Sequence, residues 1–179
     1  MPYVKTNDGV SLYYEIRGEG KPLLMVQGWT FTAKLWEKNA KEIAKHCRVV
    51  CMDNRGHGKS EKIMYSHTIA RYAMDVKNLL DELDLQEVTV LGSSMGASIL
   101  WSYLQLFGNY RVAKLICVDQ SPCQYNDADW KWGQNSCYDV ESFIRICDRI
   151  IYDPRGAAED MARGVLYQEA SLGQIKMIA

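Results

Sequence analysis

The sequence predicts an α/β fold, in which helices cover both faces of a mostly parallel β-sheet. Two observations predict it. Beyond residue 30, short apolar runs that are typical of buried strands alternate with amphipathic helical segments. Hydrophobic residues make up 47% of the 179 residues, so the chain is long and apolar enough to bury a core. Strands joined through helices run parallel, and the connecting helices cover both faces of their sheet.

The first thirty residues are predicted to form a β-meander. Residues 3–6 precede a turn signal at 7–9, and residues 10–17 alternate between apolar and polar side chains. A second turn at 18–20 leads into a short, fully apolar strand at 23–26. We therefore expect antiparallel strands at one edge of the sheet.

Between residues 36 and 118 the pattern predicts three helices and three strands. The third helix is apolar nearly all round, which favours burial, and Gly108 is suited to end it. The predicted helices are 36–47, 69–83 and 95–107, and the predicted strands are 48–52, 87–91 and 112–118.

Beyond Asp119 the chain changes character, and only helices are predicted there. Residues 123–137 are polar and aromatic, and apolar residues from 140 to 151 share one face of a helix. Asp153 and Pro154 are typical of the start of a further helix.

Composition excludes several classes of function. The net charge is −1, so the sequence offers no electrostatic reason to bind nucleic acid or an anionic membrane. No apolar window is long enough to span a bilayer, and the N-terminus lacks the apolar run of a signal peptide. The six cysteines form no C-x-x-C pair, and we expect no metal and no organic cofactor. A reduced, cytoplasmic location is the simplest interpretation, with disulfides in a secreted form as the alternative.

The segment Gly92-Ser93-Ser94-Met95-Gly96 matches the pattern G-x-S-x-G between a predicted strand and a predicted helix. In this context the pattern indicates a nucleophile elbow, which exposes the Ser94 hydroxyl on a sharp turn. Glycines on either side let the strand and the helix approach that turn, and the Met95 N–H points at a developing oxyanion. The alternative is a plain strand-to-helix turn made of small residues.

A second oxyanion donor is expected from the loop that follows the strand at 23–26. Gly28 permits close backbone approach there, and the N–H of Trp29 is the candidate donor. The alternative is an ordinary tight turn.

Four segments together resemble the α/β-hydrolases, in the branch of haloperoxidase-like esterases and enol-lactone hydrolases. They are residues 27–29, 53–60, 92–96 and 119–122. The resemblance implies that residues 1–122 are the N-terminal part of an incomplete hydrolase core. It also implies that residues 123–179 begin a helical cap. Gln27 stands where many relatives have a scaffold histidine.

The triad order of this fold is serine, then an acid, then histidine, and the sequence departs from it. All three histidines, His46, His57 and His67, precede Ser94. By resemblance, the chain corresponds to the N-terminal two-thirds of a hydrolase, and the triad histidine is absent from it. His57 is a candidate substitute base, although the resemblance gives it a structural turn. His46 is expected as a charge partner at a helix C-terminus, and His67 near a helix N-cap.

Asp119 ends the last predicted strand and is a candidate triad acid, with a turn-capping or supporting role as the alternative. Asp53 and Arg55 are expected to brace their loop through a hydrogen bond or ion pair. Four aromatic residues could line an acyl pocket or pack within the cap, and the sequence favours neither; they are Tyr125, Trp130, Trp132 and Tyr138.

These features predict a serine hydrolase of small carboxylic esters or lactones, with an acyl-enzyme on Ser94. A non-catalytic binding protein on a truncated hydrolase scaffold is one alternative. A hydrolase whose histidine comes from a partner chain is another. The strand at 112–118 would form an uncovered edge, which predicts self-association or a C-terminal region packed in place of missing strands.

Overall fold

The computed structural model describes residues 2–124, 128–133 and 140–165. The chain divides into two compact units, residues 1–120 and residues 121–179.

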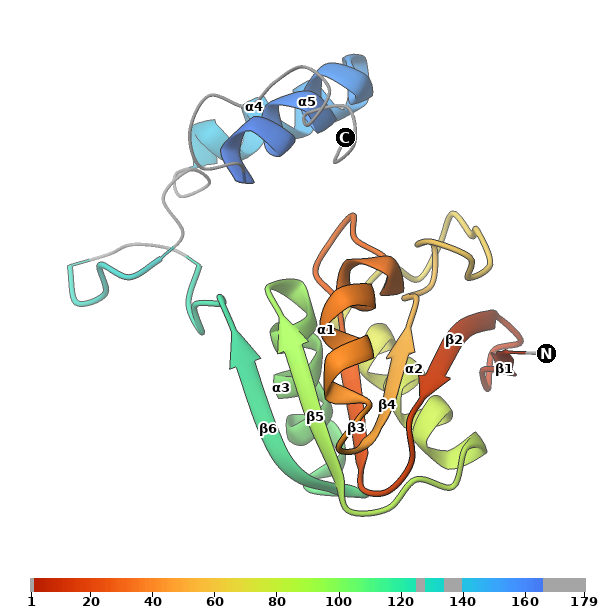
Figure 1. Cartoon of the computed structure of the whole chain (residues 1–179). Coiled ribbons are helices and arrows are strands. Elements are labelled where there is room, and N and C mark those ends of the chain that lie inside the picture. Colours follow the sequence, from red (N-terminus) through yellow and green to blue (C-terminus); the bar gives the residue numbers. More distant parts are fainter. Residues whose placement is uncertain (1, 125–127, 134–139, 166–179) are drawn as a thin grey trace. The chain divides into compact units, whose positions relative to one another are not determined.

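The first unit is built on one six-stranded sheet in the order β1-β2-β4-β3-β5-β6 (Figure 1). The β1–β2 and β2–β4 pairs are antiparallel, and the β4–β3, β3–β5 and β5–β6 pairs are parallel. The predicted mostly parallel sheet with an antiparallel edge is therefore confirmed. The strands are β1 (Tyr3–Lys5), β2 (Ser11–Arg17), β3 (Pro22–Val26), β4 (Arg48–Met52), β5 (Val88–Ser93) and β6 (Val112–Val118).

The predicted meander is wrong for its third strand. β3 does not pair with β2; β4 lies between them and pairs with both. The reason is burial: every residue from Leu23 to Val26 is buried, so β3 needs covered faces and a strand on each side. It lies between β4 and β5, whereas the half-buried β2 remains towards the edge.

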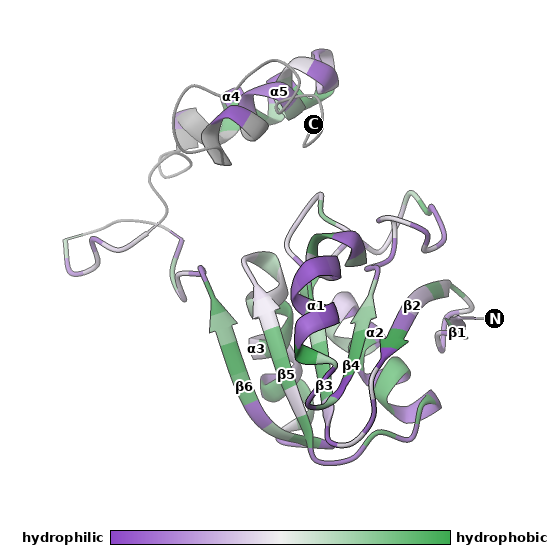
Figure 2. Cartoon of the chain, viewed as in Figure 1, coloured by the Kyte–Doolittle hydropathy of each residue, from purple (hydrophilic) through white to green (hydrophobic). Residues whose placement is uncertain are grey.

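Helices cover both faces of the sheet, as predicted. On one face, α2 (Ile69–Glu82) and α3 (Met95–Phe107) enclose the larger core, which includes Leu24, Val50 and Val90. On the other face, the 3₁₀-helix η1 (Ala33–Trp36) and α1 (Glu37–Ile43) cover a smaller cluster around Met25 and Cys51. Figure 2 shows the green, hydrophobic residues along the central strands.

The helix predicted at 36–47 is shorter than expected. Its first turn belongs to η1, where the Thr32 side chain accepts a hydrogen bond from the Lys34 N–H. After Ile43 the chain tightens into turns, and the His46 N–H donates to the Ile43 carbonyl at 2.9 Å. Cys47 therefore lies beyond the helix, although it still packs on the smaller cluster. By contrast, α3 has the predicted bounds, and Gly108 follows it with a left-handed φ of 61°.

β6 is one of the two edge strands of the sheet, and most of its residues are exposed. Ile116 is 43% exposed and Val118 is 40% exposed. The uncovered edge that the sequence predicts is therefore present in this unit. Self-association through it stays a prediction.

The second unit contains α4 (Val140–Tyr152) and α5 (Pro154–Val165), which pack against each other. Asp153 lies before Pro154, and its Oδ1 accepts the Gly156 N–H at 2.9 Å. Asp153 also forms an ion pair with Arg149 at 2.7 Å. Both helices were predicted, whereas their role as a cap stays a prediction.

The aromatic cluster expected near the cap is only partly described. Tyr125 and Tyr138 lie outside the described residues. The Trp130 indole donates to the Cys123 carbonyl at 3.2 Å, and Trp132 is 77% exposed. The acyl pocket and the packing interpretation both stay open.

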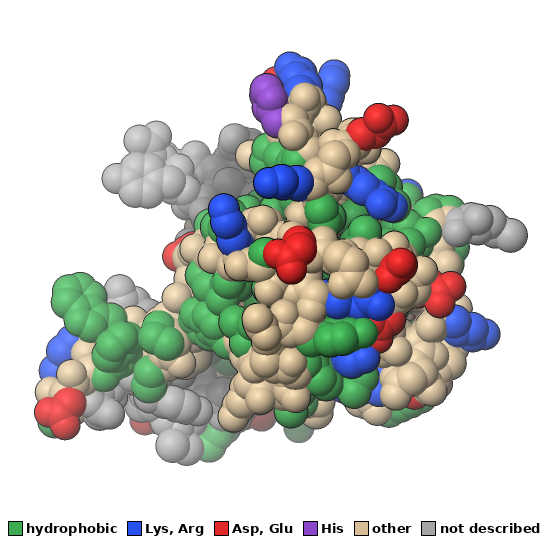
Figure 3. Space-filling view, turned by 90° about the horizontal axis from the view of Figure 1, so that it is seen from below, with side chains coloured by type: hydrophobic (Ala, Val, Ile, Leu, Met, Phe, Trp, Pro, Cys, Tyr) green, Lys and Arg blue, Asp and Glu red, His purple; other side chains and the backbone are tan. Residues whose placement is uncertain are grey.

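On the face seen in Figure 3, acidic and basic side chains of the described residues are interspersed rather than gathered by sign. Across the described part of the chain, no helix has the length and apolar character needed to cross a membrane. The five cysteines in that part of the chain, all except Cys137, are free thiols.

Candidate active site

Ser94 occupies the turn between β5 and α3, with φ 51° and ψ −124°. A non-glycine residue in this left-handed region is strained by about 1–3 kcal/mol, so surrounding contacts must hold it. Its N–H donates to the Val118 carbonyl at 3.0 Å, and its own carbonyl accepts from the Ala97 N–H at 2.8 Å. Its side chain makes no cap hydrogen bond with the helix. The backbone is held in place while the hydroxyl stays out of the helix cap.

Three glycines allow this turn to be packed closely. A Cβ added to Gly92 would lie 2.5 Å from the Ala97 nitrogen, and one added to Gly96 would collide with the Val26 carbonyl oxygen. A Cβ added to Gly28 would lie 3.1 Å from the Ser94 Cβ. The ends of β3, β5 and α3 therefore meet at Ser94, as the elbow pattern predicts.

Each candidate oxyanion donor directly follows one of the two residues that approach each other here, Ser94 and Gly28. Met95 is the first residue of α3, so its N–H is one of the groups that helix geometry leaves without an intrahelical partner. Trp29 directly follows Gly28 and is 45% exposed. Thr30, the next residue, has a left-handed φ of 67°. The loop after β3 thus carries a second strained backbone position beside the elbow.

Asp119, the candidate acid, directly follows β6 and is exposed. Its φ is 51°, which is again left-handed. Because the preceding Val118 carbonyl accepts the Ser94 N–H, the backbone at Asp119 adjoins the elbow. Strained non-glycine residues therefore follow the C-terminal ends of three neighbouring strands, β3, β5 and β6. Four other non-glycine residues, Ser66, Asp84, Glu87 and Arg111, also have positive φ, so the position at the strand ends rather than the strain itself marks this site.

The three histidines are engaged elsewhere or exposed. His57 Nδ1 donates to the Arg55 carbonyl within its own loop at 3.0 Å. His67 precedes the N-cap residue Thr68 of α2, as expected; its Nε2 donates to the Ile63 carbonyl at 2.8 Å. His46 lies exposed after α1. Among the described residues, none of them forms a hydrogen bond with Ser94.

Asp53 braces the loop after β4, as predicted. Its Oδ1 accepts the Ala33 N–H at 2.6 Å, and its Oδ2 accepts the Lys59 N–H at 2.7 Å. The Ser60 hydroxyl donates to the Asp53 carbonyl at 2.6 Å. Both carboxylate oxygens are therefore used by the backbone, which indicates a structural role.

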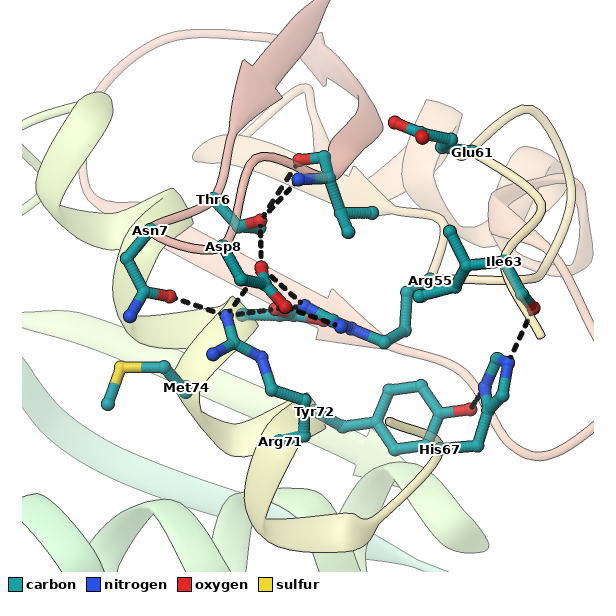
Figure 4. A network of polar contacts seen from close by, with 12 residues as sticks. Thr6, Asn7, Asp8, Arg55, Glu61, Ile63, His67, Arg71, Tyr72 and Met74 are labelled. Atoms are coloured by element: carbon teal, nitrogen blue, oxygen red, sulfur yellow. Dashed lines mark hydrogen bonds and ion pairs between the residues drawn. The ribbon is translucent and has the colours of Figure 1, made fainter. Parts of the chain in front are cut away.

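Arg55 is fully buried in a network of ion pairs that Figure 4 shows in part. Its Nε and Nη2 each donate to Asp75 at 2.6 Å, and its Nη1 donates to Asp8 at 2.9 Å. Arg71 joins the network through Asp8 at 3.0 Å. Burial opposes the charge on Arg55, but the hydrogen bonds to Asp75 and Asp8 outweigh it and raise the guanidinium pKa. The hydrogen bond from Arg55 holds the pKa of Asp8 well below its usual range.

An ion pair was expected for Arg55, but neither of its partners, Asp8 and Asp75, was predicted. Asp75 carried a usable signal, because it lies between Tyr72 and Leu79 on the buried face of a helix. A carboxylate at such a position needs a buried cation. Within the described residues, no cluster of three or more His, Cys, Asp or Glu side chains is arranged to hold a metal ion.

The sequence profile of the α/β hydrolase fold matches residues 21–149. Among curated proteins, the non-heme chloroperoxidase CPO-A1 of Kitasatospora aureofaciens is 31% identical over 123 residues. The bifunctional esterase/perhydrolase DCH of Acinetobacter calcoaceticus is 30% identical over 125 residues. Each alignment covers 68% of this chain and 45% of the relative. The chain thus spans less than half the length of these two relatives.

Solved structures have the same fold. The bromoperoxidase of Bacillus anthracis superposes with a TM-score of 0.88 at 25% identity. The superposition covers 98% of this chain and 66% of that structure.

Proposed function

This chain belongs to the α/β-hydrolase fold family, and from that premise we propose that it is a serine hydrolase or the nucleophile-bearing part of one. The proposed substrates are small carboxylic esters or lactones. The observation that carries the proposal is the backbone of Ser94, a strained serine between a strand and a helix. The esterase named among the relatives supports this substrate class.

In the proposed reaction, Ser94 Oγ attacks the carbonyl carbon of the ester and loses its proton to a base. The N–H groups of Met95 and Trp29 stabilise the oxyanion of the tetrahedral intermediate. Collapse of this intermediate breaks the carbon–oxygen bond to the alcohol, which leaves with a proton and gives an acyl-enzyme. Water then attacks the acyl group, releases the acid and restores the serine. Asp119 is the candidate acid that would orient the base.

The base is the element that this chain does not supply in the expected order, because no histidine follows Ser94. A serine hydroxyl is a weak nucleophile without a base within hydrogen-bond reach. A second candidate is a hydrolase whose histidine comes from another chain, or a scaffold that binds a partner without catalysis.

A fluorophosphonate probe tests the proposal. We expect the chain to be labelled and the Ser94→Ala variant to remain unlabelled, with p-nitrophenyl acetate hydrolysis lost in parallel. Ser98→Ala is a matched control, because Ser98 lies one helical turn further along α3. Labelling no faster than in Ser94→Ala would reject catalysis by this chain alone and favour the second candidate.

A further inference from the structure

The loop that carries Trp29 is held at both of its ends by two successive residues after β4. At its start, Asn54 Nδ2 donates to the Gln27 carbonyl at 3.4 Å. At its end, Asp53 Oδ1 accepts the Ala33 N–H at 2.6 Å. Residues 28–32 lie between these points, including the left-handed Thr30.

The first contact bears directly on the candidate oxyanion donor. The Gln27 carbonyl and the Gly28 N–H belong to one planar peptide, and the next peptide carries the Trp29 N–H. The Gln27 carbonyl is also confined from the side of α3, since a Cβ on Gly96 would lie 3.0 Å from its oxygen. The Asn54 amide and the first turn of α3 therefore both restrict this peptide plane.

The cost of placing Asn54 here indicates that the contact matters. Asn54 is fully buried, and its Oδ1 has no hydrogen-bond partner among the described residues. An apolar side chain of similar volume would avoid that cost, so packing alone does not favour asparagine.

The clamp is itself rigidly anchored. The Asn54 carbonyl accepts the His57 N–H at 2.9 Å, and Asp53 binds the Lys59 N–H through its second oxygen. Because the loop at 53–60 is held by its own hydrogen bonds, its contacts with Gln27 and Ala33 can restrict the motion of the loop at 28–32.

Resting on the proposed function, we propose that Asp53 and Asn54 are positioning residues that clamp the loop at 28–32 and set the Trp29 N–H against Ser94. Neither residue touches substrate. Their effect passes through the backbone, because oxyanion donors act only when they are fixed before the reaction.

Asn54→Leu is the main test, because it keeps the branched shape of the side chain and replaces the amide oxygen and nitrogen with methyl groups. We expect backbone amides of residues 28–32 to exchange with deuterium about 10-fold faster, while amides of β3 and β5 keep their wild-type rates. The maximal rate of fluorophosphonate labelling should fall about 10-fold or more, with the half-saturating probe concentration unchanged. Asn54→Ala replaces this variant if leucine prevents folding.

Asn78→Leu is the matched control. Asn78 Nδ2 also donates to a backbone carbonyl, that of Met74 at 2.7 Å, on α2. It should leave both the exchange of residues 28–32 and the labelling rate unchanged.

Wild-type exchange at residues 28–32 in Asn54→Leu would overturn the clamp, as would an equal acceleration at all amides. If the wild-type chain is not labelled at all, the proposed catalysis fails. The hydrogen-exchange measurement then still shows whether Asn54 holds the loop at 28–32.

Discussion

The loop after β4 and the turn after β5 both lie at the C-terminal ends of the parallel strands, but they use polar residues in opposite ways. In the loop after β4, every oxygen of the Asp53 carboxylate has a backbone partner and Arg55 is enclosed by carboxylates. In the turn after β5, Ser94 is strained and its side chain caps nothing. The first loop looks catalytic in the sequence but is structural, because its charged groups are satisfied by the fold. The second leaves the Ser94 hydroxyl without a cap hydrogen bond to the helix.

The largest effect is expected from Arg55→Met, which leaves the buried Asp75 carboxylate without its main cation. Removing one partner of a buried pair costs about 3–5 kcal/mol in unfolding free energy. Urea denaturation followed by circular dichroism measures it. Lys45→Met, which breaks the exposed pair with Glu42, is the control and should cost less than about 1 kcal/mol. Equal losses in the two variants would contradict a buried, structural role for Arg55.

Gly28→Ala tests the strained turn at Ser94 and the loop that approaches it. The new methyl carbon would lie 3.1 Å from the Ser94 Cβ, so the loop must move away from the elbow. Loss of one oxyanion donor typically lowers the rate about 100-fold or more, and we expect a similar loss in fluorophosphonate labelling. The melting temperature serves as the control and should change little. Unimpaired labelling would argue against a donor in this loop.

Gly58→Ala probes how closely the braced loop is packed. Gly58 has φ 47°, and an added Cβ would collide with the Asp53 carboxylate. We expect a loss of roughly 2 kcal/mol or more, made up of backbone strain and displaced hydrogen bonds. Gly9→Ala is matched to it, because φ is 84° and nothing lies within 4 Å, so it reports the strain alone. If the two variants lose the same stability, the Asp53 contacts contribute nothing.

The smallest effect is expected from pH. The hydrogen bond from Arg55 lowers the pKa of Asp8 in the folded chain, so the folded state binds fewer protons than the unfolded state. The contribution of Asp8 is therefore complete above the ordinary carboxyl pKa of about 4 and is lost as the pH falls below it. Melting temperatures between pH 6 and pH 2 should fall less steeply in Asp8→Asn than in the wild type. A steeper fall in the variant would contradict a stabilising contribution from the ionised Asp8 carboxylate.

Local patterns carried most of the fold prediction. The bounds of α3 were predicted because its apolar residues and Gly108 are signals within one segment. The third strand of the meander was placed wrongly, because pairing depends on which distant strand can cover a buried run. The helix at 36–47 was overextended for a related reason: its apolar spacing continues to Cys47 after the helix itself has ended.

The sequence by itself determined the family, the strand–serine–helix turn and the set of candidate residues, because each is encoded by neighbours in the chain. Only the tertiary structure decided that Arg55 pairs with Asp8 and Asp75, 47 and 20 residues away in sequence. Only it brought Asn54 to the Gln27 carbonyl. The Arg55 pairs depend on how the loop after β4 meets α2 and the β1–β2 turn, and the Asn54 contact depends on the pairing of β3 with β4. Local spacing carries no information about either.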